Sequence, residues 1–179
     1  LFARDEAATR AIGAALAARL EPGHVLFLHG ELGAGKTTLV RGLLQQLLPG
    51  QRVKSPTYTL VERYDCARLS VLHLDLYRLA DPAELEFLGV REDAGAAALL
   101  VEWPERGQGV LPAADLEISL STQGAGRAIR LSATGAAGAA LLAGWLTVAP
   151  GLLSFWLLGR GQPGRAMLLA AMLLAIPVV

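Results

Sequence analysis

The sequence predicts an α/β fold, in which helices flank a sheet of mixed parallel and antiparallel strands, followed by an apolar C-terminal tail. Unbroken apolar runs at 25–28 and 98–101 are typical of strands that are buried on both faces of a sheet. Apolar residues at helical spacing over 8–20 and 36–48 predict amphipathic helices that cover such a sheet. Alternating segments further along the chain add an antiparallel pair.

The first half of the chain gives a helix, a strand and a second helix in succession. Apolar residues recur every four positions up to Leu20, and Glu21-Pro22-Gly23 stops this helix. The strand over 25–28 follows, and a glycine-rich loop comes directly after it. The second helical pattern, over 36–48, ends at Pro49-Gly50. This order of strand, loop and helix is the one that a phosphate-binding loop requires.

The middle of the chain predicts a loop, two strands and a helix. Segment 54–58 is expected to be a loop because the proline within it disfavours helix at the preceding residue. Segments 59–64 and 70–76 alternate or run apolar, and we expect two strands there. Asp81-Pro82-Ala83-Glu84 then has the pattern of a helix start with a capping box, and Gly89 closes that helix.

The remaining elements are a buried strand and a hairpin. Ala98-Leu99-Leu100-Val101 delivers Glu102 at its carboxyl end, where α/β sheets bind ligands, and Pro104 prevents easy continuation. Segments 115–121 and 128–133 alternate apolar with polar residues on either side of a glycine-containing turn. This pattern predicts an antiparallel hairpin at the sheet edge.

The loop Gly30-Glu31-Leu32-Gly33-Ala34-Gly35-Lys36-Thr37 matches the P-loop pattern that holds the phosphates of a nucleoside triphosphate. Its glycines let backbone N–H groups close around the phosphates at a helix N-terminus, whose partial positive charge favours anions. We expect Lys36 to neutralise the β and γ phosphates and Thr37 to bind Mg²⁺. The alternative interpretation is a glycine-rich turn with a solvated lysine. The expected nucleotide contacts are Gly30, Gly33, Gly35, Lys36, Thr37 and Thr38.

A P-loop needs an acidic partner for its metal ion, at the end of a neighbouring strand. Asp75 is the first candidate and Glu102 the second, and either could bind Mg²⁺ directly or through water, or orient the attacking water. Either could also be an ordinary acid at a strand end. His73 lies two residues before Asp75, on the same side of the strand, where it either supports the metal site or merely caps the sheet edge.

Other polar residues give weaker signals. Thr57 is either a mobile switch residue that senses the γ-phosphate or a turn threonine. His24 and His29 flank the first strand without partner spacing and are interpreted as structural. The chain has no Asn-Lys-x-Asp or Thr-Lys-x-Asp segment to read guanine, so ATP is favoured over GTP.

The composition limits the partners. Sixteen basic residues balance 16 acidic ones, so the chain has no strong field of its own to attract RNA or an anionic membrane. The single cysteine, Cys66, excludes an internal disulfide and fits a reducing compartment. Charged residues interrupt the first 20 positions, which does not match a secretory signal, and we expect a cytoplasmic location.

Together these motifs resemble one family, the bacterial TsaE (YjeE) ATPases of tRNA threonylcarbamoyladenosine biosynthesis. The resemblance extends over about residues 2–145, which predicts a domain with a P-loop NTPase-like sheet over 1–145 and an extension over 146–179. The motifs that carry the resemblance are the P-loop with Thr38, Ser55-Pro56-Thr57-Tyr58-Thr59-Leu60, His73-Leu74-Asp75-Leu76-Tyr77-Arg78, Glu84-Leu85-Glu86 with Leu88-Gly89, and Glu102-Trp103-Pro104-Glu105.

The resemblance implies a weak ATPase that acts with a TsaB–TsaD-type complex and supports the modification of adenosine 37 in certain tRNAs. The protein would meet tRNA only indirectly, through these partners, in agreement with its neutral charge. Lys36 and Thr37 match the phosphate and metal contacts. Thr57 matches the switch threonine, Asp75 the Walker-B-like acid, and Glu102 the second catalytic acid. Trp103 matches a tryptophan near the nucleotide.

The C-terminus departs from the family, which usually ends near a short helix matching residues 136–145. Residues 131–159 carry no charge, and the chain is apolar over 166–179. Three interpretations of the extension remain open. They are a membrane-spanning helix over about 141–158, a translated secretory-signal-like segment beginning with the arginines at 160 and 165, and a helical appendage packed on the domain.

Two other function classes stay open at this point. A small-molecule or nucleotide kinase would need a second substrate pocket and an arginine-rich lid, whereas Arg41, Arg52, Arg63 and Arg68 are scattered. A membrane-attached assembly factor would use ATP as a switch and the extension as its anchor.

Overall fold

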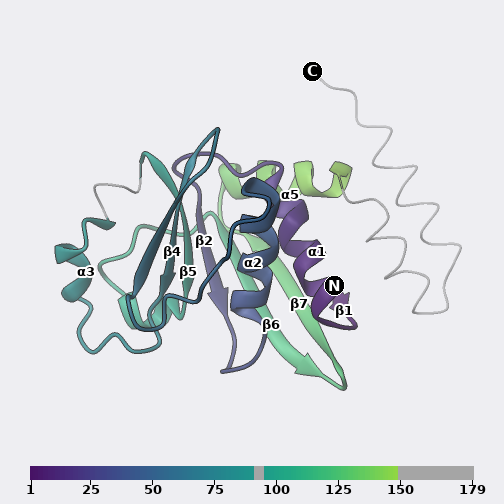
Figure 1. The fold of residues 1–179 in the computed structure, drawn as a ribbon, viewed down its shortest axis with the longest axis horizontal. Helices are drawn as coiled ribbons and strands as arrows, with labels where there is room; N and C mark the ends of the chain where they lie inside the picture. The colour runs from purple at the N-terminus through teal and green to yellow at the C-terminus, as the bar shows by residue number, and fades with distance from the viewer. Residues whose placement is uncertain (91–94, 149–179) are drawn as a thin grey trace, which may run out of the picture.

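The computed structural model describes residues 1–90 and 95–148, in which a seven-stranded sheet carries helices against its faces (Figure 1). The strand order is β1-β7-β6-β2-β5-β4-β3, and the predicted α/β class is confirmed. The strands are β1 (Phe2–Ala3), β2 (Val25–His29), β3 (Val61–Asp65), β4 (Ser70–Asp75), β5 (Ala97–Glu102), β6 (Leu116–Gln123) and β7 (Gly126–Ala133).

The centre of the sheet is parallel and its two ends are antiparallel. β2 lies between β5 and β6 and is parallel to both, and β4 is parallel to β5. β3 pairs antiparallel with β4, and β7 pairs antiparallel with β6. The carboxyl ends of β2, β4 and β5 therefore meet at one edge of the sheet, which is where α/β sheets place their ligands.

The predicted hairpin forms, but its position at the sheet edge was wrong. The two-residue strand β1 pairs with the first part of β7, Phe2 opposite Ala128 and Ala3 opposite Arg127. A two-residue strand is too short to show the alternation by which strands are recognised in a sequence. The edge of the sheet on this side is therefore β1.

The first helix, α1 (Glu6–Ala17), ends earlier than the apolar pattern suggested. Asp5 caps its start, since the Asp5 Oδ1 atom accepts a hydrogen bond of 2.7 Å from the Ala8 amide. At its end, the Arg68 guanidinium donates to the carbonyl of Ala17 and, at 2.7 Å, to that of Leu20. Leu20 itself is fully buried, so the apolar pattern continues beyond the helix.

The other helices are α2 (Lys36–Leu47), α3 (Glu84–Phe87), the 3₁₀ helix η1 (Pro104–Gly107) and α5 (Ala136–Val148). The helix expected between Asp81 and Gly89 is shorter than predicted. Its capping hydrogen bonds are present, from the Asp81 amide to Glu84 Oε1 and from the Ala83 amide to Asp81 Oδ1. The backbone around α3 makes i to i+3 bonds, such as Leu88 N to Leu85 O, so the segment is a series of tight turns.

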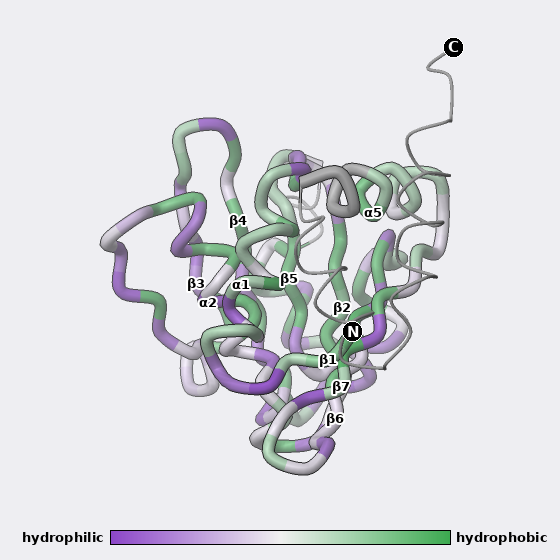
Figure 2. Tube along the Cα trace, turned by 90° about the vertical axis from the view of Figure 1, so that its right-hand side faces the viewer, coloured by the Kyte–Doolittle hydropathy of each residue, from purple (hydrophilic) through white to green (hydrophobic). Residues whose placement is uncertain are grey.

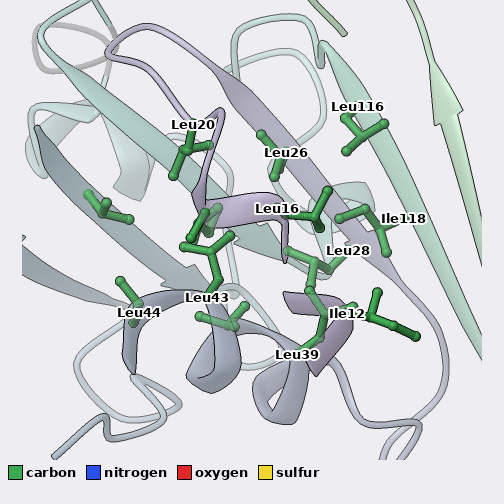
Figure 3. Packing of buried hydrophobic residues seen from close by; sticks show 14 of the residues in the cluster. Ile12, Leu16, Leu20, Leu26, Leu28, Leu39, Leu43, Leu44, Leu116 and Ile118 are labelled. Carbon is green, nitrogen blue, oxygen red and sulfur yellow. The ribbon is translucent and has the colours of Figure 1, made fainter. Parts of the chain in front are cut away.

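The sheet separates two apolar clusters. One lies between the sheet and the helices α1 and α2, and includes Leu16, Leu43 and Leu28 (Figure 3). The other, on the opposite face, includes Leu99 and Val101 and is covered by leucines of the segment 76–90. The central strands are accordingly hydrophobic along most of their length (Figure 2). Alternation along β4 and β5 leaves three polar residues, His73, Asp75 and Glu102, on the face of the α2 side.

The C-terminal part of the described chain is the helix α5, in which Leu141 is buried in the first apolar cluster. Within residues 1–90 and 95–148, none of the helices combines the length and the apolar character needed to cross a membrane. Residues 149–179 lie outside the described part, and with them lie most of the predicted span over 141–158 and the signal-like segment.

Candidate functional site

The P-loop connects β2 to α2, as the sequence predicted, and its backbone depends on glycine. Gly30, Gly33 and Gly35 have φ angles of 138°, 79° and 105°, a region that residues with a side chain rarely adopt. At Gly30 a Cβ atom would lie 2.3 Å from the Leu120 carbonyl oxygen of β6. The loop therefore passes closely against a neighbouring strand before it enters the helix.

Lys36 lies inside the loop that precedes it. Its Nζ donates to the carbonyl oxygens of Gly30 at 2.6 Å and Glu31 at 3.0 Å, and lies 3.9 Å from the centre of the Trp103 ring. The residue is 4% exposed. Burial lowers the pKa of the ammonium group, an effect that the nearby carboxylates, Glu102 first, partly oppose.

Glu102 joins the P-loop to the sheet. One carboxylate oxygen accepts a hydrogen bond of 3.0 Å from the Thr37 hydroxyl, and the other lies 2.9 Å from Nε2 of His73. The side chain is buried, and its position at the end of β5 is directly opposite Asp75 in β4. Both predicted acids therefore reach the same edge of the sheet beside α2.

The His73 side chain is fully buried and lies against Glu102. Its Nδ1 atom is buried and has no hydrogen-bond partner among residues 1–90 and 95–148, whereas Nε2 faces the carboxylate. A buried nitrogen that carries a proton and has no acceptor costs more than one that presents a lone pair. The tautomer with the proton on Nε2 therefore fits best, and in it His73 donates to Glu102 and holds one oxygen of that carboxylate in place.

Asp75 holds the loop before β3 instead of the P-loop. Its Oδ2 atom accepts hydrogen bonds from the hydroxyls of Thr57 at 2.6 Å and Ser55 at 3.2 Å. Its Oδ1 atom accepts one of 3.2 Å from the Tyr77 amide. The Asp75 amide also donates to the Leu60 carbonyl at 3.0 Å, and Leu60 has a φ of 62°. The candidate switch residue Thr57 is therefore bound to the candidate metal ligand Asp75.

Trp103 adopts a backbone conformation that is unusual for a bulky residue, with a φ of 60°. This turn directs the chain from β5 into η1 and places the indole over Lys36 and 5.0 Å from the ring of Tyr77. Local strain of this kind is typical of functional sites.

These residues surround a cavity of about 250 Å³ at the carboxyl edge of the sheet. The structure thus brings together all the predicted site residues except Gly30, which packs against β6 at the start of the loop. His24 and His29 lie elsewhere: His24 accepts from the Glu21 amide, and His29 contacts Glu117. The cavity is lined by Leu32, Gly33, Gly35, Lys36, Thr37, Thr38, Ser55, Thr57, Asp75, Tyr77, Glu102 and Trp103.

The oxygen atoms at one end of the cavity suit Mg²⁺. Mg²⁺ prefers oxygen ligands and is usually held by one or two carboxylates together with substrate phosphates. The Thr37 hydroxyl and the carboxylates of Glu102 and Asp75 provide such a set beside the P-loop. No group of three or more His, Cys, Asp or Glu side chains within 1–90 and 95–148 could hold a metal ion by itself. The site therefore fits an ion that is shared with a phosphate ligand.

Sequence reasoning missed several contributors to the site, among them Ser55 and Arg127. Ser55 shares Asp75 with Thr57, and its place two residues before Thr57 was a signal that could have identified it. Arg127 reaches the P-loop from β7 and donates to the carbonyls of Ala34 at 3.0 Å and Gly33 at 3.3 Å. No local pattern in the sequence indicates Arg127, because the contact joins segments more than 90 positions apart.

Comparisons with known proteins agree with this architecture. The family model described as threonylcarbamoyl adenosine biosynthesis protein TsaE matches residues 3–129. The chain is similar to the tRNA threonylcarbamoyladenosine biosynthesis protein TsaE of Haemophilus influenzae, with 51% identity over 110 residues, 61% of this chain and 70% of that protein. The corresponding protein of Bacillus subtilis is 40% identical over 117 residues, 65% of this chain and 73% of that protein.

A solved structure shows the same fold. The crystal structure of Bacillus subtilis YdiB superposes with a TM-score of 0.66 at 30% identity, and the match covers 80% of this chain and 90% of that one. The matched fraction of YdiB shows that almost its whole chain corresponds to the domain described above.

Proposed function

Because the chain belongs to the TsaE family and to tRNA threonylcarbamoyladenosine biosynthesis, we propose that it binds and hydrolyses ATP within that machinery. The observation that carries the proposal is the convergence of a lysine, a hydroxyl and two carboxylates on one cavity at the end of the parallel strands. A buried ammonium group next to backbone amides at a helix N-terminus suits a polyphosphate.

In this proposal the residues divide the work between binding and hydrolysis. The amides of the P-loop and Lys36 bind the β and γ phosphates, and Lys36 exchanges its two carbonyl acceptors for phosphate oxygens. Thr37 and Glu102 hold Mg²⁺, with Asp75 next to them. When bound, Mg²⁺ neutralises charge on the phosphates. The tryptophan ring shields the lysine from water, which strengthens its attraction for phosphate.

Hydrolysis requires a water molecule that attacks the γ-phosphorus while the bond to the ADP oxygen breaks. One of the two carboxylates, Glu102 or Asp75, orients this water and accepts its proton. Both are already engaged by hydroxyls of the protein itself, Glu102 by Thr37 and Asp75 by Thr57 and Ser55. This engagement would give a physical reason for the weak activity that we expect of the isolated chain.

We further propose that a TsaB–TsaD-type complex stimulates the reaction by moving the segment that carries Ser55 and Thr57. The protein would then meet tRNA through its partners, in agreement with its balanced charge of 16 basic and 16 acidic residues. ATP is favoured over GTP as the nucleotide because the sequence has no guanine-reading segment.

The test is a measurement of ATP turnover by the full chain, alone and with a TsaB–TsaD complex, together with calorimetry of ATP binding in the presence of Mg²⁺. We expect binding in the wild type, loss of binding in Lys36→Met, and stimulation by the complex. Glu102→Ala should still bind ATP but should not be stimulated. Absence of ATP binding in the wild type would overturn the proposal, and phosphate transfer to a small molecule instead of water would indicate the kinase class.

A further inference from the structure

A basic side chain supports the P-loop from outside the nucleotide cavity. The Nε atom of Arg127 donates to the Ala34 carbonyl at 3.0 Å, and an Nη atom donates to the Gly33 carbonyl at 3.3 Å. A third bond, of 3.0 Å, runs to the carbonyl of Gly126 next to it. The guanidinium thus spans two consecutive peptide units of the loop, an arrangement that its planar fork of donors makes possible.

The loop needs such support because of its glycine conformations. At Gly33 and Gly35 the backbone has positive φ, and both residues line the cavity. Successive turns of this kind direct amides toward an anion and leave the intervening carbonyls on the other side. Arg127 binds those carbonyls but does not line the cavity itself.

The two basic residues that contact the loop are therefore not equivalent. Lys36 holds the carbonyls of Gly30 and Glu31 from within the cavity, where phosphate oxygens would compete for its ammonium group. Arg127 binds from the side of β7, away from the ligand. Its contacts are compatible with a bound triphosphate, so it can hold the loop both before and after binding.

Arg127 is itself firmly placed. Its backbone in β7 lies between two pairing partners, Ala3 of β1 and Thr122 of β6. The adjacent strand β6 also provides the Leu120 carbonyl against which Gly30 packs. The start and the middle of the P-loop are thus held by the same hairpin.

We propose that Arg127 is a positioning residue of the nucleotide site, which holds the P-loop in the conformation that receives a triphosphate. The inference rests on the proposed function in so far as a triphosphate is the ligand. Preorganisation of this kind raises affinity because the loop does not have to be ordered when the ligand binds.

The test compares three variants of the full chain. Arg127→Met removes the donors and keeps an apolar stem, and Arg127→Lys keeps the charge but loses the fork. Arg130→Met is the matched control, because Arg130 lies exposed on the same strand and its loss changes the net charge equally. We would measure the Kd for ATP with Mg²⁺ by calorimetry, and amide hydrogen exchange of residues 31–37 without nucleotide.

We expect Arg127→Met to raise the Kd about tenfold, equivalent to about 1.4 kcal/mol, and to speed exchange in the loop. Arg127→Lys should lie between it and the wild type, and Arg130→Met should match the wild type. An unchanged Kd in Arg127→Met would overturn the proposal. If Arg127→Met raises the Kd and also lowers the Tm, the decision rests on Arg127→Lys. A Kd of Arg127→Lys within roughly twofold of the wild-type Kd then overturns the proposal.

The exchange measurement separates this inference from the proposed function. Should the wild type bind no ATP, the proposed function fails, but faster exchange of residues 31–37 in Arg127→Met would still show that Arg127 holds the loop. Unchanged exchange in that variant would instead refute the role of Arg127, whatever the nucleotide result.

Discussion

The two loops around the cavity are held in different ways. The P-loop is fixed through its backbone, by Lys36 from within, by Arg127 from β7, and by the close approach of Gly30 to β6. The segment 54–60, here called the switch segment, reaches the cavity mainly through two hydroxyls that share one oxygen atom of Asp75. One loop is therefore a preformed cradle, and the other depends on a carboxylate that a metal ion would also attract.

This difference bears on how the protein could respond to a nucleotide. In the proposed function, contacts to P-loop carbonyls on the outer side would not be lost on phosphate binding, because phosphate would bind the amide side. The hydroxyl contacts to Asp75 compete directly with any cation that this carboxylate binds. Leu60, at the end of the switch segment, has a φ of 62°, a conformation that costs energy for a residue with a side chain. We therefore propose that the switch segment is the part of the site that moves.

The largest expected effect tests the rigid side of this comparison. Gly30→Ala would place a Cβ atom 2.3 Å from the Leu120 carbonyl at a φ of 138°, so β6 or the loop must shift. We expect the free energy of unfolding to fall by about 3 kcal/mol or more and ATP binding to be lost. Gly50→Ala is the control, since its φ is 82° and its Cβ would meet no atom within 4 Å. It should cost only about 1 kcal/mol. If urea unfolding shows equal losses of free energy in Gly30→Ala and Gly50→Ala, the close approach of Gly30 to β6 does not constrain the loop.

The next prediction concerns the carboxylate on the P-loop side. Glu102→Gln preserves the shape of the side chain but removes its charge next to Thr37 and His73. We expect kcat for ATP hydrolysis to fall about 100-fold, or about 2.7 kcal/mol, with little change in the Kd for ATP measured without Mg²⁺. Glu105→Gln is the matched control, because Glu105 is half-exposed and does not line the cavity. Full activity in Glu102→Gln would move the catalytic role to Asp75.

The sequence was informative about this site where the pattern is local. The P-loop, its flanking strand and helix, and the acids at two strand ends could be predicted because each is a short motif with its own period. Asp75 and Glu102 become neighbours for a simple reason, since parallel strands present their carboxyl ends at one edge. The side of the strand on which His73 lies followed from the same alternation.

The unpredicted parts depend on strand order and on tertiary contacts. Arg127 meets the P-loop only because β6 lies next to β2 and β7 next to β6, and no residue spacing specifies that order. The Arg68 side chain, from the connection between β3 and β4, binds two carbonyls at the end of α1, a contact that no local pattern specifies. The sequence also did not indicate that Glu102 binds the P-loop whereas Asp75 binds the switch segment. This division depends on which hydroxyls reach each carboxylate.

A smaller effect tests the mobile side of the comparison. Thr57→Val keeps the shape of the side chain but removes the hydroxyl that donates to Asp75 at 2.6 Å. A hydrogen bond to a charged acceptor contributes about 1.5 kcal/mol or more, so amides of residues 55–60 should exchange at least about tenfold faster. Thr57→Ser, which retains the hydroxyl, should stay near wild type. Exchange in residues 31–37 should not change, and a parallel increase there would show that the two loops are coupled, against the comparison drawn above.

The smallest effect concerns the charge at the centre of the cradle. Burial lowers the pKa of Lys36 from its ordinary value of 10.5, so the native protein releases this proton at a lower pH than the unfolded chain does. Across that interval the unfolded chain binds more protons, and the contribution of Lys36 to the free energy of unfolding therefore rises with pH. ATP affinity should move in the opposite direction, because phosphate attracts the protonated form.

These two opposite trends can be measured against variants of the two lysines in the chain, Lys36 and Lys54. Between neutral pH and pH 10, the free energy of unfolding from urea titrations should rise with pH more in the wild type than in Lys36→Met, by less than about 1.4 kcal/mol per pH unit. ATP calorimetry of the wild type over the same range should show an affinity that falls with pH. Lys54→Met, which removes the other lysine, should follow the wild type. A pH dependence of unfolding that is identical in Lys36→Met and wild type would show that the ammonium group is well solvated. Lys36 would then be no part of a dry, preformed cradle, and the contrast between the two loops would rest on Arg127 and Gly30 alone.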